Sequence, residues 1–243
     1  MKKFLTIICS LALCLLVYSS ACYSASYPSG AWRYRMTVTV ETPEGIRTGS
    51  AVREVSVQSQ PCFDACIDVT KVRGEAVVVD LGKRGILFAL LRSQASVDYA
   101  SNIFFTMFPI TDEKQKDSKN PRAFFDYYDQ LKNATADIPL DQPPPDGTTK
   151  HRDYLPEFVW FRDMNDPKSV ELVKPDNMAA SFGEGVKLKD VKIEITSEPV
   201  TTGIEKRIPP YGQETGWYQW QRALPYGSPL AVGPSEFEKR SMK

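Results

Sequence analysis

The sequence predicts an α+β fold, made mainly of antiparallel β-sheet with a few helices. Apolar and polar residues alternate over residues 32–41 and again over 189–196, as they do in strands that place one face on a core. Turn signals separate such segments, and only one segment shows a clear helical period. With 42% hydrophobic residues, the chain of 243 residues can bury a sizeable core, as one domain or two small ones.

The balanced charge of the chain bears on which class of partner it could bind. The chain has 30 Lys and Arg against 30 Asp and Glu, so electrostatics give no reason to expect nucleic acid. Its single histidine excludes metal sites and catalytic groups that need several histidines. We expect no cofactor.

The first part of the chain predicts two hairpins. The strand at 32–41 ends at Thr42-Pro43-Glu44-Gly45, where proline and glycine occupy the positions that a type I turn prefers. Residues 48–57 would return from this turn. Residues 75–81, rich in valine, and residues 86–91 predict the second hairpin. We expect these four strands to form one antiparallel meander.

The middle of the chain predicts one helix and one connector. Residues 97–110 are apolar without a clean period, so helix and strand both stay open there. Asn120 is a favoured helix cap and Pro121 a favoured first residue. The apolar residues that follow share one helical face: Phe124, Tyr127, Tyr128 and Leu131. Residues 137–153, rich in proline, predict an extended connector.

Past the connector, residues 158–161 and 170–173 predict strands, and residues 176–182 predict a short helix that ends at a glycine. The strand at 189–196 follows. The last residues, 235–243, carry too few apolar groups for us to expect order.

These elements suggest a single α+β domain at 26–210, followed by an aromatic and proline-rich C-terminal tail at 211–243. Aromatic side chains with a polar group are enriched at binding surfaces. Trp217, Tyr218 and Trp220 are therefore candidates for contact with a partner. The alternative is a tail that folds back over its own sheet.

The N-terminus predicts export. Residues 1–25 combine a cationic start, an apolar run and small residues, which is typical of a secretory signal peptide. Cleavage after Ala25 would leave a soluble chain. Cleavage after Ala21, which would limit the signal to residues 1–21, would leave Cys22 first, where a bacterial lipoprotein is acylated. We expect a protein of the periplasm, or a membrane-anchored lipoprotein, of a Gram-negative bacterium.

The cysteines agree with export. Two of the five leave with the signal peptide, and Cys22 is either removed or acylated. Cys62 and Cys66 remain, and in an oxidising compartment we expect them to form a disulfide bond that closes a short loop. A zinc site would need two further ligands of a kind that the chain does not offer.

Two blocks of sequence carry a resemblance. The first includes WRYRMTVTVETPEG at 32–45, TGS at 48–50, GEAVVVDLG at 74–82 and LFALL at 87–91, and the second includes FRDMNDP at 161–167, PDN at 175–177, FG at 182–183 and VTTGIEK at 200–206. Together they resemble an uncharacterised family of exported or lipoprotein-like proteobacterial proteins. The resemblance implies export and favours acylation of Cys22. It transfers no activity and no catalytic residue.

Two groups of residues remain as candidates for chemistry. His151 lies between cations in a polar loop, where it could act as a base, although no nucleophile motif accompanies it. Asp163, Asn165 and Asp166 offer hard oxygen ligands for Ca²⁺ without the spacing of an EF-hand, and turn formation explains them equally well.

The leading hypothesis is an exported envelope protein that acts by protein–protein contact and not by catalysis. The alternative is a periplasmic hydrolase or Ca²⁺-binding protein that uses His151 or Asp163 and Asp166. The partner is not predicted by the sequence. A membrane would be reached only through the signal peptide or a lipid on Cys22.

Overall fold

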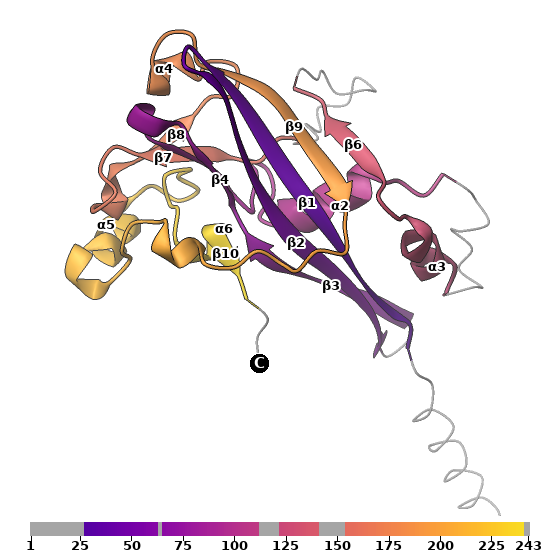
Figure 1. Ribbon diagram of the computed structural model, residues 1–243. Helices are drawn as coiled ribbons and strands as arrows, with labels where there is room; N and C mark the ends of the chain where they lie inside the picture. The colour runs from indigo at the N-terminus through magenta and orange to yellow at the C-terminus, as the bar shows by residue number, and fades with distance from the viewer. Residues whose placement is uncertain (1–26, 63–64, 112–121, 141–153, 241–243) are drawn as a thin grey trace, which may run out of the picture.

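The computed structural model describes residues 27–62, 65–111, 122–140 and 154–240, with the side chains of all of these except 61–67 (Figure 1). The described residues form two antiparallel sheets and five α-helices. This confirms the predicted α+β fold with mainly antiparallel sheet.

The larger sheet has six strands in the order β10-β3-β2-β1-β9-β6. Its strands are β1 (Ser29–Thr42), β2 (Gly45–Cys62), β3 (Ala65–Glu75), β6 (Thr135–Ile138), β9 (Lys187–Ile195) and β10 (Glu238–Lys239). Figure 1 shows the long strands β1, β2, β3 and β9 crossing the molecule side by side. The first hairpin and the strand near 189–196 are therefore confirmed.

The smaller sheet has four strands in the order β4-β5-β7-β8. These are β4 (Val77–Asp80), β5 (Ile86–Ala89), β7 (Phe158–Phe161) and β8 (Val170–Val173). The helices are α2 (Tyr99–Met107), α3 (Ala123–Gln130), α4 (Ala179–Phe182), α5 (Trp217–Ala223) and α6 (Pro234–Phe237), and single 3-10 turns are η1 (Gly82–Arg84), η3 (Pro167–Ser169), η4 (Ile204–Lys206) and η5 (Gln213–Thr215).

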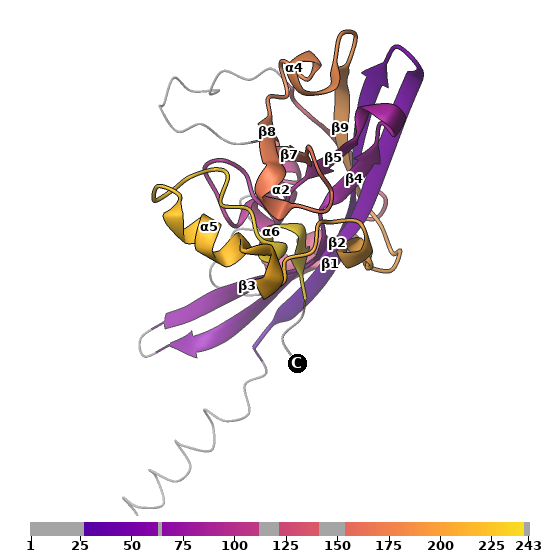
Figure 2. The same cartoon turned by 90° about the vertical axis from the view of Figure 1, so that its left-hand side faces the viewer.

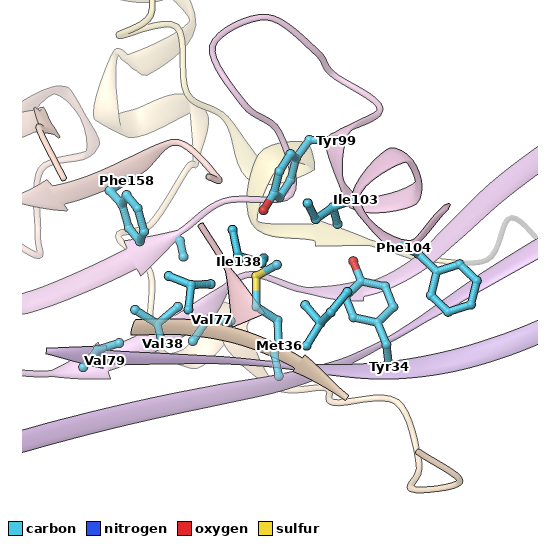
Figure 3. Packing of buried hydrophobic residues seen from close by; sticks show 14 of the residues in the cluster. Tyr34, Met36, Val38, Val77, Val79, Tyr99, Ile103, Phe104, Ile138 and Phe158 are labelled. Carbon is cyan, nitrogen blue, oxygen red and sulfur yellow. The ribbon is translucent and has the colours of Figure 1, made fainter. Parts of the chain in front are cut away.

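The main core lies between the two sheets. Every second residue of β1 is buried there: Trp32, Tyr34, Met36, Val38 and Val40. Val77 and Val79 of β4 face this surface, and Tyr99 and Phe104 of α2 cover it further along (Figure 3). The sheets come close at Gly49, where a Cβ atom would clash with the carbonyl oxygen of Val78.

Arg53 is a fully buried charge in this core, at 0% exposure. Its Nε donates to the carbonyl oxygen of Glu75 at 3.0 Å, and its Nη2 donates to that of Ala89 at 3.4 Å. Burying a guanidinium is costly unless its donors are satisfied. The two carbonyls belong to different sheets, so Arg53 links the sheets where β3 gives way to β4.

The expected four-strand meander is wrong in two respects. The chain forms β3 between the two predicted hairpins, and β3 pairs with β2. The chain then bends at Gly74, which has a φ of +137° that glycine adopts far more readily than other residues. After this bend, β4 and β5 belong to the smaller sheet.

The structure also describes the apolar segment, the aromatic helix and part of the connector in the middle of the chain. Residues 99–107 are helix, and the predicted aromatic helix is α3, whose expected start at Asn120 and Pro121 lies outside the described residues. Within the expected connector, residues 137–138 belong to β6, and 141–153 are not described.

The end of the chain is ordered, contrary to expectation, over residues 235–240. Phe237 is 0% exposed and packs against Phe88 and Phe161, with ring centroids 5.4 and 6.0 Å apart. Order therefore comes from contacts with distant residues and not from the apolar content of the segment itself. Residues from the expected tail thus share a core with the smaller sheet.

Candidate functional site

The strand β3 has an open edge. It is 11 residues long and pairs on one side with β2 over residues 54–62. On its other side, β10 pairs only with Glu75 and Gly74. Among the described residues, no strand covers β3 from Ala65 to Arg73. The hairpin of β2 and β3 projects from the rest of the molecule in Figure 2. We call residues 68–73, whose side chains are described, the open β3 edge.

The register shows which backbone groups face outward. On the side of β10, the amide of Ala76 donates to the carbonyl oxygen of Phe237 at 2.7 Å. Hydrogen-bonded residues alternate along an antiparallel strand. Asp68, Thr70 and Val72 therefore turn their N–H and C=O groups to the open side.

The neighbouring strands give the same answer. The amide of Ser59 in β2 donates to the carbonyl oxygen of Pro28. The N–H and C=O groups of odd-numbered residues of β2 therefore point to β1, and those of even-numbered residues point to β3. Where β3 has turned away, the amide of Val52 donates to Oγ1 of Thr201 and its carbonyl accepts from the amide of Thr201. The backbone groups of Val52 are thus paired with Thr201. The outward backbone groups of the open β3 edge have no partner within the described chain.

A groove runs beside this edge and has a volume of about 470 Å³. One wall is β3 from Thr70 to Arg73, and the other is the start of α2 at Asp98 and Ser101. Residues 238–240 close one end. The helix is fixed in place because the hydroxyl of Tyr34 donates to the carbonyl oxygen of Ala100 at 2.6 Å.

The rim of the groove is positive on the face turned away from the core. There Glu54 lies between two guanidinium groups, with Arg33 at 2.8 Å and Arg73 at 3.1 Å. Lys71 follows on the same face and has no partner among the described residues. This part of the rim thus carries three cations and one carboxylate, and that carboxylate pairs with two of the three.

A second cavity of about 470 Å³ lies on the other side of β10. Carboxylate oxygens of Glu75, Glu205 and Glu238 lie within 4.8 Å of one another there. Glu75 is buried, accepts the amide of Ile204 at 3.0 Å, and its pKa is raised mainly by burial. Carboxylates at this spacing can hold a metal ion.

The chain supplies its own cation to this cluster. Nε of Arg240 pairs with Glu238 at 2.5 Å, and its pKa is raised by that bond and by the charges of Glu238, Glu205 and Glu75. This ion pair joins residues two apart in the same C-terminal segment, and β10 is held on β3 by its backbone pairing with Gly74 and Glu75. We therefore describe the three carboxylates as a cluster that Arg240 partly neutralises.

Asp163, Asn165 and Asp166 lie together in one exposed turn. Oδ1 of Asp163 accepts the amide of Asn165 at 2.8 Å, and Oδ1 of Asp166 accepts the amide of Lys168 at 3.0 Å, where it caps η3. Both carboxylates bond the backbone of their own turn, as Asp and Asn commonly do. Their use as metal ligands stays a prediction.

The candidate contact residues differ in exposure. Trp217 is buried at 3% exposure against Tyr211, Tyr218 exposes 47%, and Trp220 is half-buried. Of the three, Tyr218 offers the most surface to a partner.

The remaining candidates stay predictions. Cys22 and His151 lie outside the described residues. The backbone register pairs Pro61 with Cys66 and Cys62 with Ala65, which places both cysteines at the end of the β2–β3 hairpin. Their disulfide is not tested by this register.

The sequence interpretation missed the open β3 edge, because it assigned no strand to residues 65–73. A signal was present: Ile67, Val69, Thr70 and Val72 are β-branched residues that favour strands, and a glycine follows. Three charged residues within the run hid this pattern.

No family model, curated protein or solved structure matches this chain. The resemblance to an exported proteobacterial family therefore stays a prediction. In the described part of the chain the longest helix has nine residues, and none has the length and hydropathy needed to cross a membrane.

Proposed function

We propose that this is an exported, non-catalytic envelope protein that binds an extended polypeptide by adding it as a strand to the open β3 edge. One observation carries the proposal: Asp68, Thr70 and Val72 present backbone groups that no described strand pairs, beside a groove of about 470 Å³. Export rests on the N-terminal sequence, and contact with a protein was the leading hypothesis there.

The geometry suits strand addition. Peptides that bind in this way hydrogen-bond to an exposed sheet edge, and neighbouring pockets then select their side chains. Each backbone hydrogen bond contributes a net ~0.5–1.5 kcal/mol, so several in a row supply useful affinity. Soluble proteins usually cover or shorten such an edge because it recruits other chains.

Among the described residues, Asp163 and Asp166 show no comparable feature in support of the hydrolase or Ca²⁺-binding alternative, and His151 lies outside those residues. The Asp163 and Asp166 carboxylates are bonded to their own turn. A contact function needs only a surface and an edge, and both are present.

Thr70→Pro tests the proposal most simply. Its amide faces the open side, so proline removes a donor and blocks the edge while the ladder to β2 keeps its bonds. We expect the purified protein to bind fluorescent decapeptides of extended, threonine-rich sequence, measured by anisotropy, and the variant to lose at least tenfold in affinity.

Thr70→Val is the matched control, because it keeps both the amide and the branched shape of the side chain. It should bind like the parent protein. Equal binding by the proline variant and the parent, or no binding of any such peptide to the parent, would contradict strand addition at this edge.

A further inference from the structure

We propose that the polypeptide bound at the open β3 edge is an acidic segment of another protein, with carboxylates at alternate positions. This inference rests on the proposed function and specifies its partner. The recognised feature is the row of cations on the face of β3 turned away from the core.

The pairing with β2 fixes the faces of the edge. Val72 and Thr70 lie opposite Val55 and Val57, which are buried in the core. Lys71 and Arg73 lie opposite Ser56 and Glu54 on the other face. In a strand added beside β3, residues directly opposite Lys71 and Arg73 point to that same outer face and are two positions apart.

Around β3, the cations on that face outnumber the carboxylates among the described residues, whereas farther along the face, at β1 and β9, Arg35 pairs with two carboxylates, Glu194 and Glu198. Glu54 is shared by Arg33 and Arg73, at 2.8 and 3.1 Å, so one positive charge is left over. Lys71 adds a second and has no partner in the described chain. Opposite charges directly across a strand pair stabilise it, and like charges destabilise it. Carboxylates of an added strand would supply what this face lacks.

A second copy of this chain does not fit the edge. Antiparallel pairing of two β3 strands about a two-fold axis keeps the same face outward in both copies. That face would then carry Lys71 and Arg73 twice. The single carboxylate of the open β3 edge, Asp68, is on the core side and accepts a hydrogen bond from Oγ of Ser59. Because like charges oppose this symmetric pairing, we assign the edge to a segment of a different protein.

The groove limits how the segment lies. Residues 238–240 close its end near Arg73, and Asp98, the residue before α2, lines the wall opposite β3. Carboxylates directed to that wall would meet Asp98, whereas those on the outer side meet Lys71. A segment in which acidic and uncharged residues alternate places its carboxylates beside Lys71 and its uncharged side chains beside Asp98.

Three labelled decapeptides test the inference with the purified protein. Threonine alternates with glutamate in the first, with glutamine in the second and with lysine in the third. We expect the glutamate peptide to bind at least tenfold more tightly than the glutamine peptide, and the lysine peptide to bind most weakly. The difference should shrink as salt concentration rises.

Lys71→Glu should reverse the order of the glutamate and lysine peptides, and Lys71→Gln should bring the glutamate and glutamine peptides closer together. Thr70→Pro should weaken all three. Glutamine and glutamate peptides that bind equally, yet lose binding in Thr70→Pro, would overturn the acidic preference and leave strand addition standing. Absence of binding by all three peptides would overturn both proposals.

Discussion

The carboxylate of Glu44 lies at the tip of the β1–β2 hairpin, where Arg84 holds it in a two-point ion pair. Both carboxylate oxygens lie 2.9 Å from nitrogens of Arg84, whose third nitrogen donates to the carbonyl oxygen of Phe182 at 2.7 Å. This guanidinium therefore joins the hairpin, η1 and the end of α4. Such planar two-point pairs are stronger and more specific than single contacts.

The ion pair makes stability depend on pH. It holds the pKa of Glu44 at about 2, below its ordinary value of 4.5. Because the folded-state pKa is the lower one, the stabilisation is present above about pH 4.5 and is lost as pH falls toward 2. We expect the free energy of unfolding of Glu44→Gln to approach that of the parent protein between these values, as measured by urea titration at several pH values.

Arg84→Gln is the partner control and should show the same convergence. If the gap between the parent protein and Glu44→Gln stays constant from pH 5 to pH 2, the ion pair does not contribute as described. Sequence reasoning placed Glu44 correctly in the turn after β1, but it could not name Arg84, because the turn and η1 meet only when the two sheets pack.

At the scale of elements, the C-terminal segment at residues 229–239 packs against the smaller sheet, and we call it the C-terminal strap. Arg92, ion-paired with Glu157 at 2.6 Å, donates to the carbonyl oxygens of Pro229 and Ala231. Further along, the amide of Leu91 donates to the carbonyl of Glu236 at 2.9 Å. The strap ends in β10, which closes the groove beside the open β3 edge.

Phe237→Ala tests the strap. The side chain is fully buried against Phe88 and Phe161, so its truncation should lower the free energy of unfolding by ~3–5 kcal/mol. Tyr218→Ala removes an aromatic side chain from the preceding helix that is 47% exposed, and should cost less than ~1 kcal/mol. Urea denaturation measures both, and similar losses would argue against a packed strap.

Elements were predictable where one strand or helix carries its own pattern. Strand β1 buries alternate residues from Trp32 to Thr42, so its period could be recognised from the sequence. Helix α2 could not be assigned because every residue from Tyr99 to Phe104 except Asn102 is buried, which leaves no clean alternation of apolar and polar positions. Strand β3 is exposed along one edge, and its charges broke the apolar pattern on which the prediction depended.

At the scale of the whole molecule, the sheet order joins segments that are far apart in the sequence. Val38 of β1 lies opposite Val191 of β9, and Gly74 of β3 lies opposite Lys239 of β10. No local period can specify such pairs, so the candidate site could not be assembled from the sequence. The α+β class was accessible because it depends only on which elements are present.

Export also belongs to this scale, and the mass of the native protein tests it. We expect purified native material to lack residues 1–25, or to lack residues 1–21 and carry acyl chains on Cys22. We further expect Cys62 and Cys66 to lack their thiol hydrogens. Native protein that still begins at Met1, with both thiols free, would contradict the proposed location.

The most direct test of strand addition is amide hydrogen exchange with and without the glutamate-containing peptide. Because alternate amides of β3 already bond to β2, the peptide should newly protect Asp68, Thr70 and Val72 and leave Val69, Lys71 and Arg73 unchanged. Protection that is absent, or confined to another surface, would contradict the account.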